Sequence, residues 1–131
     1  MSPLRALCIS GSPKLVRSTS AALCDTWVRA LFSSGVEATS VELKDALRSD
    51  EGRADLRARF LSADIVVLAF PLYVDTVPAL VMEGLEELFA CTGKRSRPGR
   101  LFVVVNAGFP EAWHCGVAVD VCSHFAEAFS P

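Results

Sequence analysis

Residues 65–90 read IVVLAFPLYVDTVPALVMEGLEELFA, and this stretch decides the fold class. It begins with six apolar residues, 65–70, that are rich in β-branched side chains, which is typical of a strand buried on both faces. Pro78 then opens a segment, reaching about residue 90, in which apolar side chains recur at helical spacing. A fully buried strand followed by a helix is the pattern of a parallel sheet covered by helices.

The same alternation of strand and helix runs along the whole chain. The predicted strands are 4–9, 36–43, 65–70 and 101–105, and the predicted helices are 18–34, 44–59, 78–90 and 111–129. Gly35 stands where a stop for the first helix is expected. Four alternations in 131 residues predict one domain, residues 1–131, with a doubly wound α/β fold and a parallel sheet.

Composition excludes several classes of partner. The net charge of −2 argues against nucleic acid, whose phosphates require a clear basic excess. The longest uncharged apolar run, 65–74, is too short for a bilayer, which needs about 20 residues, so we expect no membrane partner. The N-terminal residues lack the shape of a secretory signal, and we therefore expect a cytoplasmic protein.

The cysteines and the basic residues have structural interpretations. Five cysteines are an odd number without C-x-x-C spacing, so we expect packed thiols, no disulfide framework and no metal site. The one basic cluster stands beside glycine and proline, and we expect a solvated loop. Its members are Lys94, Arg95, Arg97 and Arg100.

Three loops leave the carboxyl ends of the predicted strands, where ligands bind in doubly wound folds. The loop 10–20 places hydroxyl groups at a helix N-terminus, which serves either to cap the helix or to hold a phosphate. It matches neither the Walker motif nor the dinucleotide fingerprint. The loop 71–77 has a rigid apolar surface suited to a flat ring, and the loop 106–112 permits close backbone approach. Each loop also has a purely structural interpretation, in which Pro71 only ends a strand and Gly108 only makes a turn.

These segments resemble one family. GSPK at 11–14, STS at 18–20, AFPLYVDTVPALVMEGLEEL at 69–88 and VVNAGFPEA at 104–112 are together similar to the flavodoxin-like NAD(P)H-dependent FMN reductases and related oxidoreductases. The similarity runs from residue 4 to about 129. It implies an oxidoreductase that transfers a hydride from NAD(P)H to a non-covalent FMN. The electrons then pass to an acceptor such as a quinone or a nitro compound.

The resemblance also implies which residues surround the FMN. Those expected around its phosphate are Ser10, Ser12, Lys14, Ser18, Thr19 and Ser20. Those expected at its ring are Pro71, Leu72, Tyr73 and Val74 on one edge, with Asn106, Ala107, Gly108 and Phe109 on the other. Lys14 and Arg17 have two alternatives, the FMN phosphate and the 2′-phosphate of NADPH. No catalytic side chain is implied, because the flavin supplies the chemistry.

One departure from the family concerns the sheet. Flavodoxin-like folds have five strands, and this sequence supplies four, so we expect the fifth strand to be missing. Two explanations stay open, a truncated chain or a partner that covers the exposed edge. An uncovered edge beside an apolar fourth strand invites association, and the partner we expect is a second copy in a homodimer. The missing strand also keeps open a flavin-free or non-catalytic flavodoxin-like interaction protein as the alternative function.

Two other classes share this architecture. A low-molecular-weight tyrosine phosphatase needs a cysteine, five residues and an arginine in the first loop, but that spacing from Cys8 falls on Lys14. A response-regulator receiver needs an acidic pair after the first strand, and this loop has no carboxylate. Neither pattern is met.

Overall fold

The fold is a four-stranded parallel sheet. The computed structural model describes residues 3–14, 18–72, 77–95, 98–106 and 115–129. The strands are β1 (Arg5–Ser10), β2 (Glu37–Glu42), β3 (Ile65–Pro71) and β4 (Arg100–Asn106), in the order β2-β1-β3-β4. Neighbouring strands are parallel throughout. All four predicted strands are confirmed.

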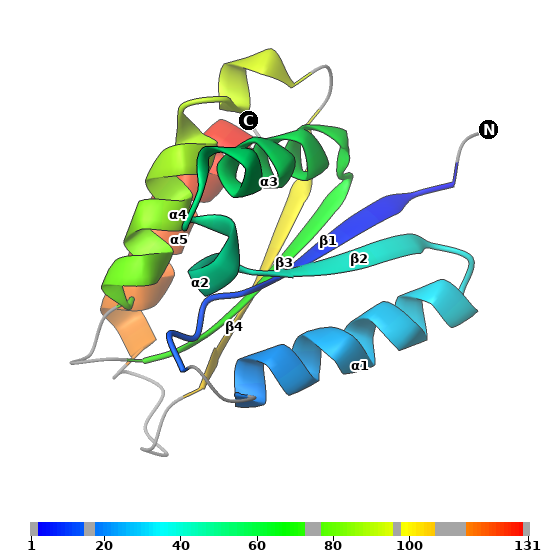
Figure 1. The fold of residues 1–131 in the computed structure, drawn as a ribbon, viewed down its shortest axis with the longest axis horizontal. Coiled ribbons are helices and arrows are strands. Elements are labelled where there is room, and N and C mark those ends of the chain that lie inside the picture. The colour runs from blue at the N-terminus through cyan, green and yellow to red at the C-terminus, as the bar shows by residue number, and fades with distance from the viewer. Residues whose placement is uncertain (1–2, 15–17, 73–76, 96–97, 107–114, 130–131) are drawn as a thin grey trace.

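Helices cover both sides of the sheet (Figure 1). The helix α1 (Thr19–Ser33) lies on one side, and the other α-helices lie on the opposite side. These are α2 (Leu43–Ala46), α3 (Asp50–Ser62), α4 (Ala79–Phe89) and α5 (Gly116–Phe129), with a 3₁₀ turn, η1 (Thr92–Lys94), after α4. The doubly wound α/β class is thereby confirmed. The helix predicted over 44–59 is in fact two, and residues 111–114 of the last predicted helix lie outside the described residues.

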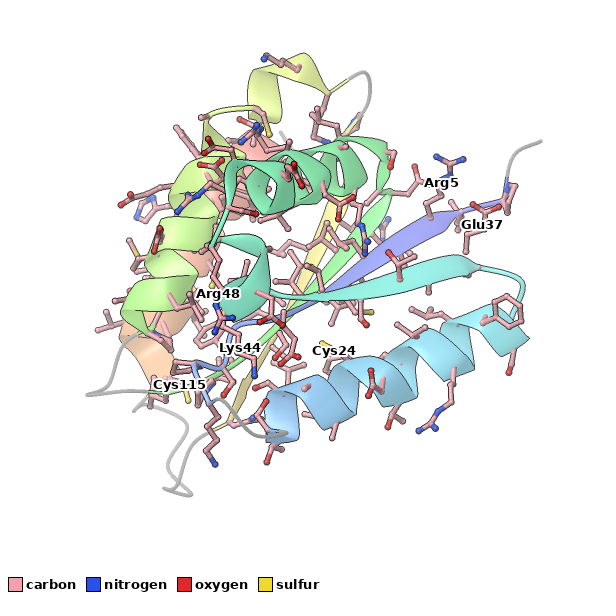
Figure 2. The ribbon with its side chains drawn as sticks, viewed as in Figure 1. Arg5, Cys24, Glu37, Lys44, Arg48 and Cys115 are labelled. Carbon is pink, nitrogen blue, oxygen red and sulfur yellow. The ribbon has the colours of Figure 1, made fainter. Side chains whose placement is uncertain are left out.

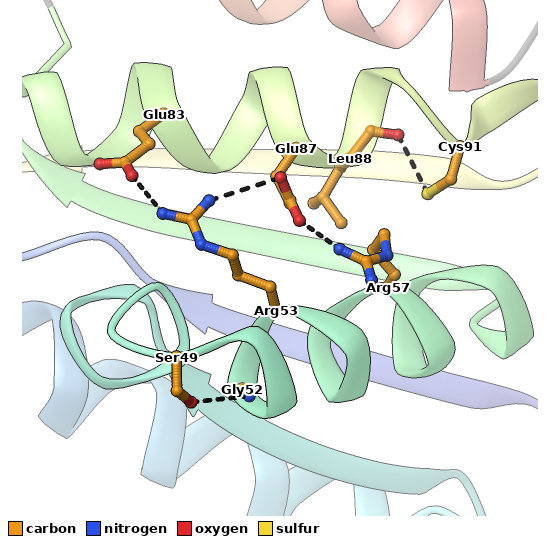
Figure 3. A network of polar contacts seen from close by, with 8 residues as sticks. All are labelled: Ser49, Gly52, Arg53, Arg57, Glu83, Glu87, Leu88 and Cys91. Atoms are coloured by element: carbon orange, nitrogen blue, oxygen red, sulfur yellow. Dashed lines mark hydrogen bonds and ion pairs between the residues drawn. The ribbon is translucent and has the colours of Figure 1, made fainter.

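The larger core lies between the sheet and helices α2 to α5. Strand side chains such as Ile9, Val66 and Phe70 are buried there against Leu56 and Phe60 of α3. Helix α3 is otherwise polar. Its outer side chains hold it to α4 through ion pairs, namely Arg53 to Glu83 at 2.5 Å, Arg53 to Glu87 at 3.4 Å, and Arg57 to Glu87 (Figure 3).

A smaller core lies under α1. It is formed by Cys8, Cys24 and Ala69, with Trp27 and Val104 packed at its margin. Burial raises the pKa of the Cys8 thiol to about 11, so this thiol stays protonated at neutral pH. All five cysteines are free. Cys8, Cys24, Cys91 and Cys122 are buried, which confirms the prediction of packed thiols for these four, whereas Cys115 is half-buried.

Arg95 does not belong to a solvated loop, and that prediction was wrong for this residue. Its guanidinium lies 5.2 Å from the ring centre of Phe60 and 4.4 Å from that of Phe129. It also donates hydrogen bonds to the carbonyl oxygens of Phe60 and, at 2.6 Å, Ala63. The planar cation therefore closes one end of the aromatic core.

Strand β4 is the edge of the described sheet next to β3. Residues Val103 and Val105 pack on the larger core, whereas Phe102 points to the α1 side and is 51% exposed. Within the described residues no strand pairs with the outer edge of β4, and no described helix is long and apolar enough to cross a membrane.

Candidate functional site

The first loop leaves β1 at the point where the direction of winding changes. Its first residue, Gly11, donates a backbone hydrogen bond of 2.7 Å to the carbonyl of Ala69 in β3. A Cβ on Gly11 would lie 2.4 Å from Cγ2 of Val81 and 3.1 Å from Cβ of Phe70. The loop therefore needs glycine here because the N-terminal part of α4 packs directly against its backbone.

Helix α1 begins beside this loop, and Ser18 is its N-cap. The Ser18 hydroxyl oxygen accepts a hydrogen bond of 3.1 Å from the backbone N–H of Ala21. The capping interpretation of the loop is thus correct for Ser18. The first intrahelical hydrogen bond runs from the N–H of Ala22 to the carbonyl of Ser18. The N–H groups of Thr19 and Ser20 therefore have no acceptor within the helix, and together with the helix dipole they form an end that suits an anion.

The end of β4 meets both α1 and the segment after β3. The side-chain amide of Asn106 donates a 3.0 Å hydrogen bond to the Ser20 hydroxyl, and Ser20 is 1% exposed. The backbone carbonyl of Asn106 accepts a 2.7 Å hydrogen bond from the backbone N–H of Leu72. The residue before Leu72, Pro71, pairs in register with Asn106. Four of the predicted site residues are therefore held together at the carboxyl edge of the sheet.

Ser12 and Lys14 lie on the turn between β1 and α1. Ser12 is buried, and its hydroxyl accepts a 3.3 Å hydrogen bond from the backbone N–H of Lys14. The Lys14 carbonyl in turn accepts a 2.5 Å hydrogen bond from Nζ of Lys44, which lies 3.6 Å from a carboxylate oxygen of Glu42. Figure 2 shows Lys44 on the side of the molecule where the first loop lies.

The donors present fit a phosphate group. The helix N-terminus offers backbone N–H groups, Thr19 offers an exposed hydroxyl, and Lys14 offers an exposed ammonium.

Ser10 differs from these residues. It is 1% exposed, and its Oγ has no hydrogen-bond partner within the part of the chain that the structure describes. Its role in binding phosphate stays a prediction, as do the roles of the other candidates.

The sequence also matches a known family. A family model of the flavodoxin-like fold matches residues 5–92, about two thirds of the chain. The chain belongs to this flavodoxin-like family. The resemblance seen in the sequence is thereby confirmed at the level of the fold family. No curated protein sequence matches the chain.

Solved structures share the fold of this flavodoxin-like chain. RosB with the bound intermediate 8-demethyl-8-formylriboflavin-5′-phosphate superposes with a TM-score of 0.74 at 18% identity, covering 97% of this chain and 60% of RosB. General stress protein 14 from Treponema denticola, in complex with FMN, gives a TM-score of 0.70 at 19% identity, covering 98% of this chain and 81% of that protein. A quinone reductase from Klebsiella pneumoniae gives a TM-score of 0.61 at 19% identity, covering 80% of this chain and 60% of that protein. This chain thus spans 60% of the length of two of these proteins.

Part of the predicted site lies outside the described residues. These positions are Tyr73, Val74, Ala107, Gly108 and Phe109, together with Arg17. Conversely, sequence reasoning missed Lys44, which supports the first loop from 30 residues away. Its position just after the second strand was the available signal, because the carboxyl ends of neighbouring parallel strands lie at the same edge.

Proposed function

We propose that this chain binds FMN without a covalent bond and acts as an NAD(P)H-dependent oxidoreductase on a small-molecule acceptor such as a quinone or a nitro compound. The phosphate of FMN would bind at the N-terminus of α1, and the flavin ring would lie along the ends of β3 and β4. A cytoplasmic location and a homodimer that covers the β4 edge are parts of the same proposal.

One observation carries this proposal: the residues expected at the phosphate and those expected at the ring converge. The hydrogen bond from Asn106 to Ser20 joins the ring side of the predicted site to the phosphate side across 86 residues of sequence. Structures of RosB with a flavin phosphate intermediate and of general stress protein 14 with FMN lend support, because both share the fold.

The residues of the chain would bind and orient the cofactor. Thr19, Lys14 and the first N–H groups of α1 would hold a dianionic phosphate, to which hydrogen bonds are strong because they are charge-assisted. Pro71 and Leu72 would form a rigid border for a planar ring, since Leu72 is fixed to Asn106 by its backbone. When bound, FMN would supply hydride chemistry that no side chain here provides.

The direct test is an absorbance titration between 300 and 550 nm, followed by desalting. We expect the purified chain to retain flavin bands after FMN is added, and to oxidise NADH or NADPH with a quinone present. Thr19→Ala together with Ser12→Ala should weaken FMN binding about tenfold or more through lost bonds to a charged group.

The matched control lies on the same helix. Thr26 is exposed, and its hydroxyl donates to the carbonyl of Ala22 at 3.0 Å, away from the predicted site. Thr26→Ala should leave FMN affinity unchanged. A wild-type chain that stays colourless after desalting would contradict the proposal.

The second candidate function is a flavin-free interaction protein. The observation that favours it is the β4 edge, where Phe102 is half exposed in an apolar strand with no described strand beyond it. A colourless chain that nevertheless associates through Phe102 would support this candidate over the oxidoreductase.

A further inference from the structure

Lys44 connects the short helix α2 to the loop that is expected to hold the phosphate. Its Nζ donates a hydrogen bond of 2.5 Å to the backbone carbonyl of Lys14 and lies 3.6 Å from a carboxylate oxygen of Glu42. The Lys44 side chain is 14% exposed, which is little for a lysine. Its ammonium therefore has two partners and little freedom to turn away into solvent.

The larger core fixes the part of the chain from which Lys44 extends. Leu43 and Ala46 of the same helix are buried, and so is Leu47, which follows the helix. Leu43 packs so closely on α4 that a Cβ on Gly84 would lie 2.9 Å from its Cδ1. The backbone of α2 is thus anchored, and the ammonium of Lys44 reaches the first loop from a fixed position.

Lys14 is held on both sides of its Cα. Its backbone N–H donates a 3.3 Å hydrogen bond to Oγ of Ser12, a residue that is 1% exposed, and its carbonyl accepts the hydrogen bond from Lys44. Lys14 itself stays exposed. Two successive peptide groups of the loop therefore have fixed directions, while the ammonium of Lys14 remains available to a ligand.

The bond from Lys44 to the Lys14 carbonyl favours an anion at this loop for two reasons. A carbonyl oxygen carries partial negative charge, which repels phosphate oxygens, and the ammonium of Lys44 offsets that charge. A loop whose donors already have the arrangement of the bound state also loses less entropy when the ligand binds. Both effects concern the phosphate group of a ligand and not an uncharged ring.

We propose that Lys44 is a positioning residue that makes the first loop selective for a phosphorylated flavin, acting through Lys14 and not by contact with the phosphate. This inference rests on the phosphate site of the proposed function. The chain then binds FMN more tightly than riboflavin, which has the same ring and lacks the phosphate. About tenfold of that preference depends on Lys44, because a hydrogen bond to a charged group is lost without it.

The test is a fluorescence titration of the full chain with FMN and with riboflavin, which gives the ratio of the two dissociation constants. Lys44→Met keeps a long side chain and removes the charged donor. We expect it to weaken FMN binding about tenfold and to leave riboflavin binding unchanged. Lys44→Arg restores a charged donor and should recover most of the wild-type preference for FMN.

The matched control is Arg48→Met. Arg48 follows Lys44 by four residues, is exposed, and lies 4.0 Å from a carboxylate oxygen of Asp45 (Figure 2). This variant changes the net charge by the same amount as Lys44→Met, but it should leave the preference for FMN over riboflavin unchanged. Lys44→Ala repeats the main comparison with a residue that favours a helix, should Lys44→Met not fold.

The outcomes separate this inference from the proposed function. If the variants of Lys44 that lack the charge keep the wild-type preference for FMN, or weaken both flavins equally, the inference is wrong. An equal loss of preference in Arg48→Met would overturn it as well, because net charge alone would then explain the effect. In these cases, FMN binding by the wild-type chain leaves the proposed function intact. A wild-type chain that binds neither flavin would contradict the proposed function and this inference with it.

Discussion

The side-chain amide of Asn106 donates a hydrogen bond of 3.0 Å to the hydroxyl of Ser20. Asn106 is the last residue of β4, and Ser20 lies in the first turn of α1. The bond thus joins the far edge of the sheet to the helix that is expected to hold the phosphate. It fixes the spacing between two parts of the candidate site that come from opposite ends of the chain.

Replacing Asn106 tests whether this bond organises the site. Asn106→Ala should lower the free energy of unfolding by about 1 kcal/mol, because Ser20 is buried and loses its partner. It should also weaken FMN binding, since the first turn of α1 is no longer tied to β4. Urea unfolding measures the first effect, and absorbance titration measures the second. Unchanged FMN affinity in a destabilised variant would mean that the bond is structural only.

A second prediction concerns the close approach of α4 to the first loop. Gly11→Ala should destabilise the chain by about 1–3 kcal/mol, because the new Cβ meets Cγ2 of Val81 at 2.4 Å. Gly93→Ala is the matched control, since a Cβ there meets nothing within 4 Å. Adding Val81→Ala to the Gly11 variant should remove the steric part of the cost. A Gly11 variant as stable as the control would show that the contact relaxes freely.

The sheet could be predicted because each strand is marked by the pattern of its own residues, without reference to distant parts of the chain. Residues 65–70 and 101–105 have no polar face, and only a parallel sheet covered on both sides buries such a run. Phe89 lies on the helical spacing of apolar residues that predicts α4, but it is 55% exposed. Helical spacing shows which side chains share the apolar side of a helix, but it does not show which edge of that side faces the sheet. In α4 the buried face is formed by Val81, Gly84, Leu85 and Leu88.

The contacts that build the site could not be predicted in this way. The pairing of Asn106 with Ser20 and the support of Lys14 by Lys44 depend on where distant segments meet in space. The position of Arg95 could not be predicted for the same reason. Its neighbours in sequence are basic, but its side chain is held by the rings of Phe60 and Phe129, and no local sequence pattern places these rings beside it.

Arg95 supports the aromatic core, which gives a third prediction. Arg95→Met should lower the free energy of unfolding by about 1–3 kcal/mol, because the carbonyls of Phe60 and Ala63 lose a charged donor and the two rings lose the cation. Lys94→Met, at the exposed neighbouring position, removes the same charge and should have little effect. Equal effects in the two variants would mean that net charge, and not the stacked contact, matters.

The buried thiols predict how stability depends on pH. Burial raises the pKa of Cys122 to about 11 from an ordinary value of 9.0. The unfolded chain releases this proton first, so the stabilising contribution is complete below pH 9 and is lost as the pH rises toward 11. In urea unfolding, Cys122→Ala should make the decline between pH 9 and 11 shallower by about 1.4 kcal/mol per pH unit. Below pH 8, the wild-type and variant curves should run parallel. Parallel curves above pH 9 as well would contradict the burial argument.

The exposed edge predicts self-association. Strand β4 presents an apolar run, and Phe102 is half exposed on its α1 side, so a second copy would bury a surface that water otherwise contacts. Sedimentation velocity over a range of concentrations should show a dimer for the wild-type chain and a monomer for Phe102→Lys. Phe32→Lys is the control, because Phe32 is 74% exposed near the end of α1 and should leave the dimer intact. A monomeric wild-type chain, or a dimer that survives Phe102→Lys, would show that β4 is not the site of association.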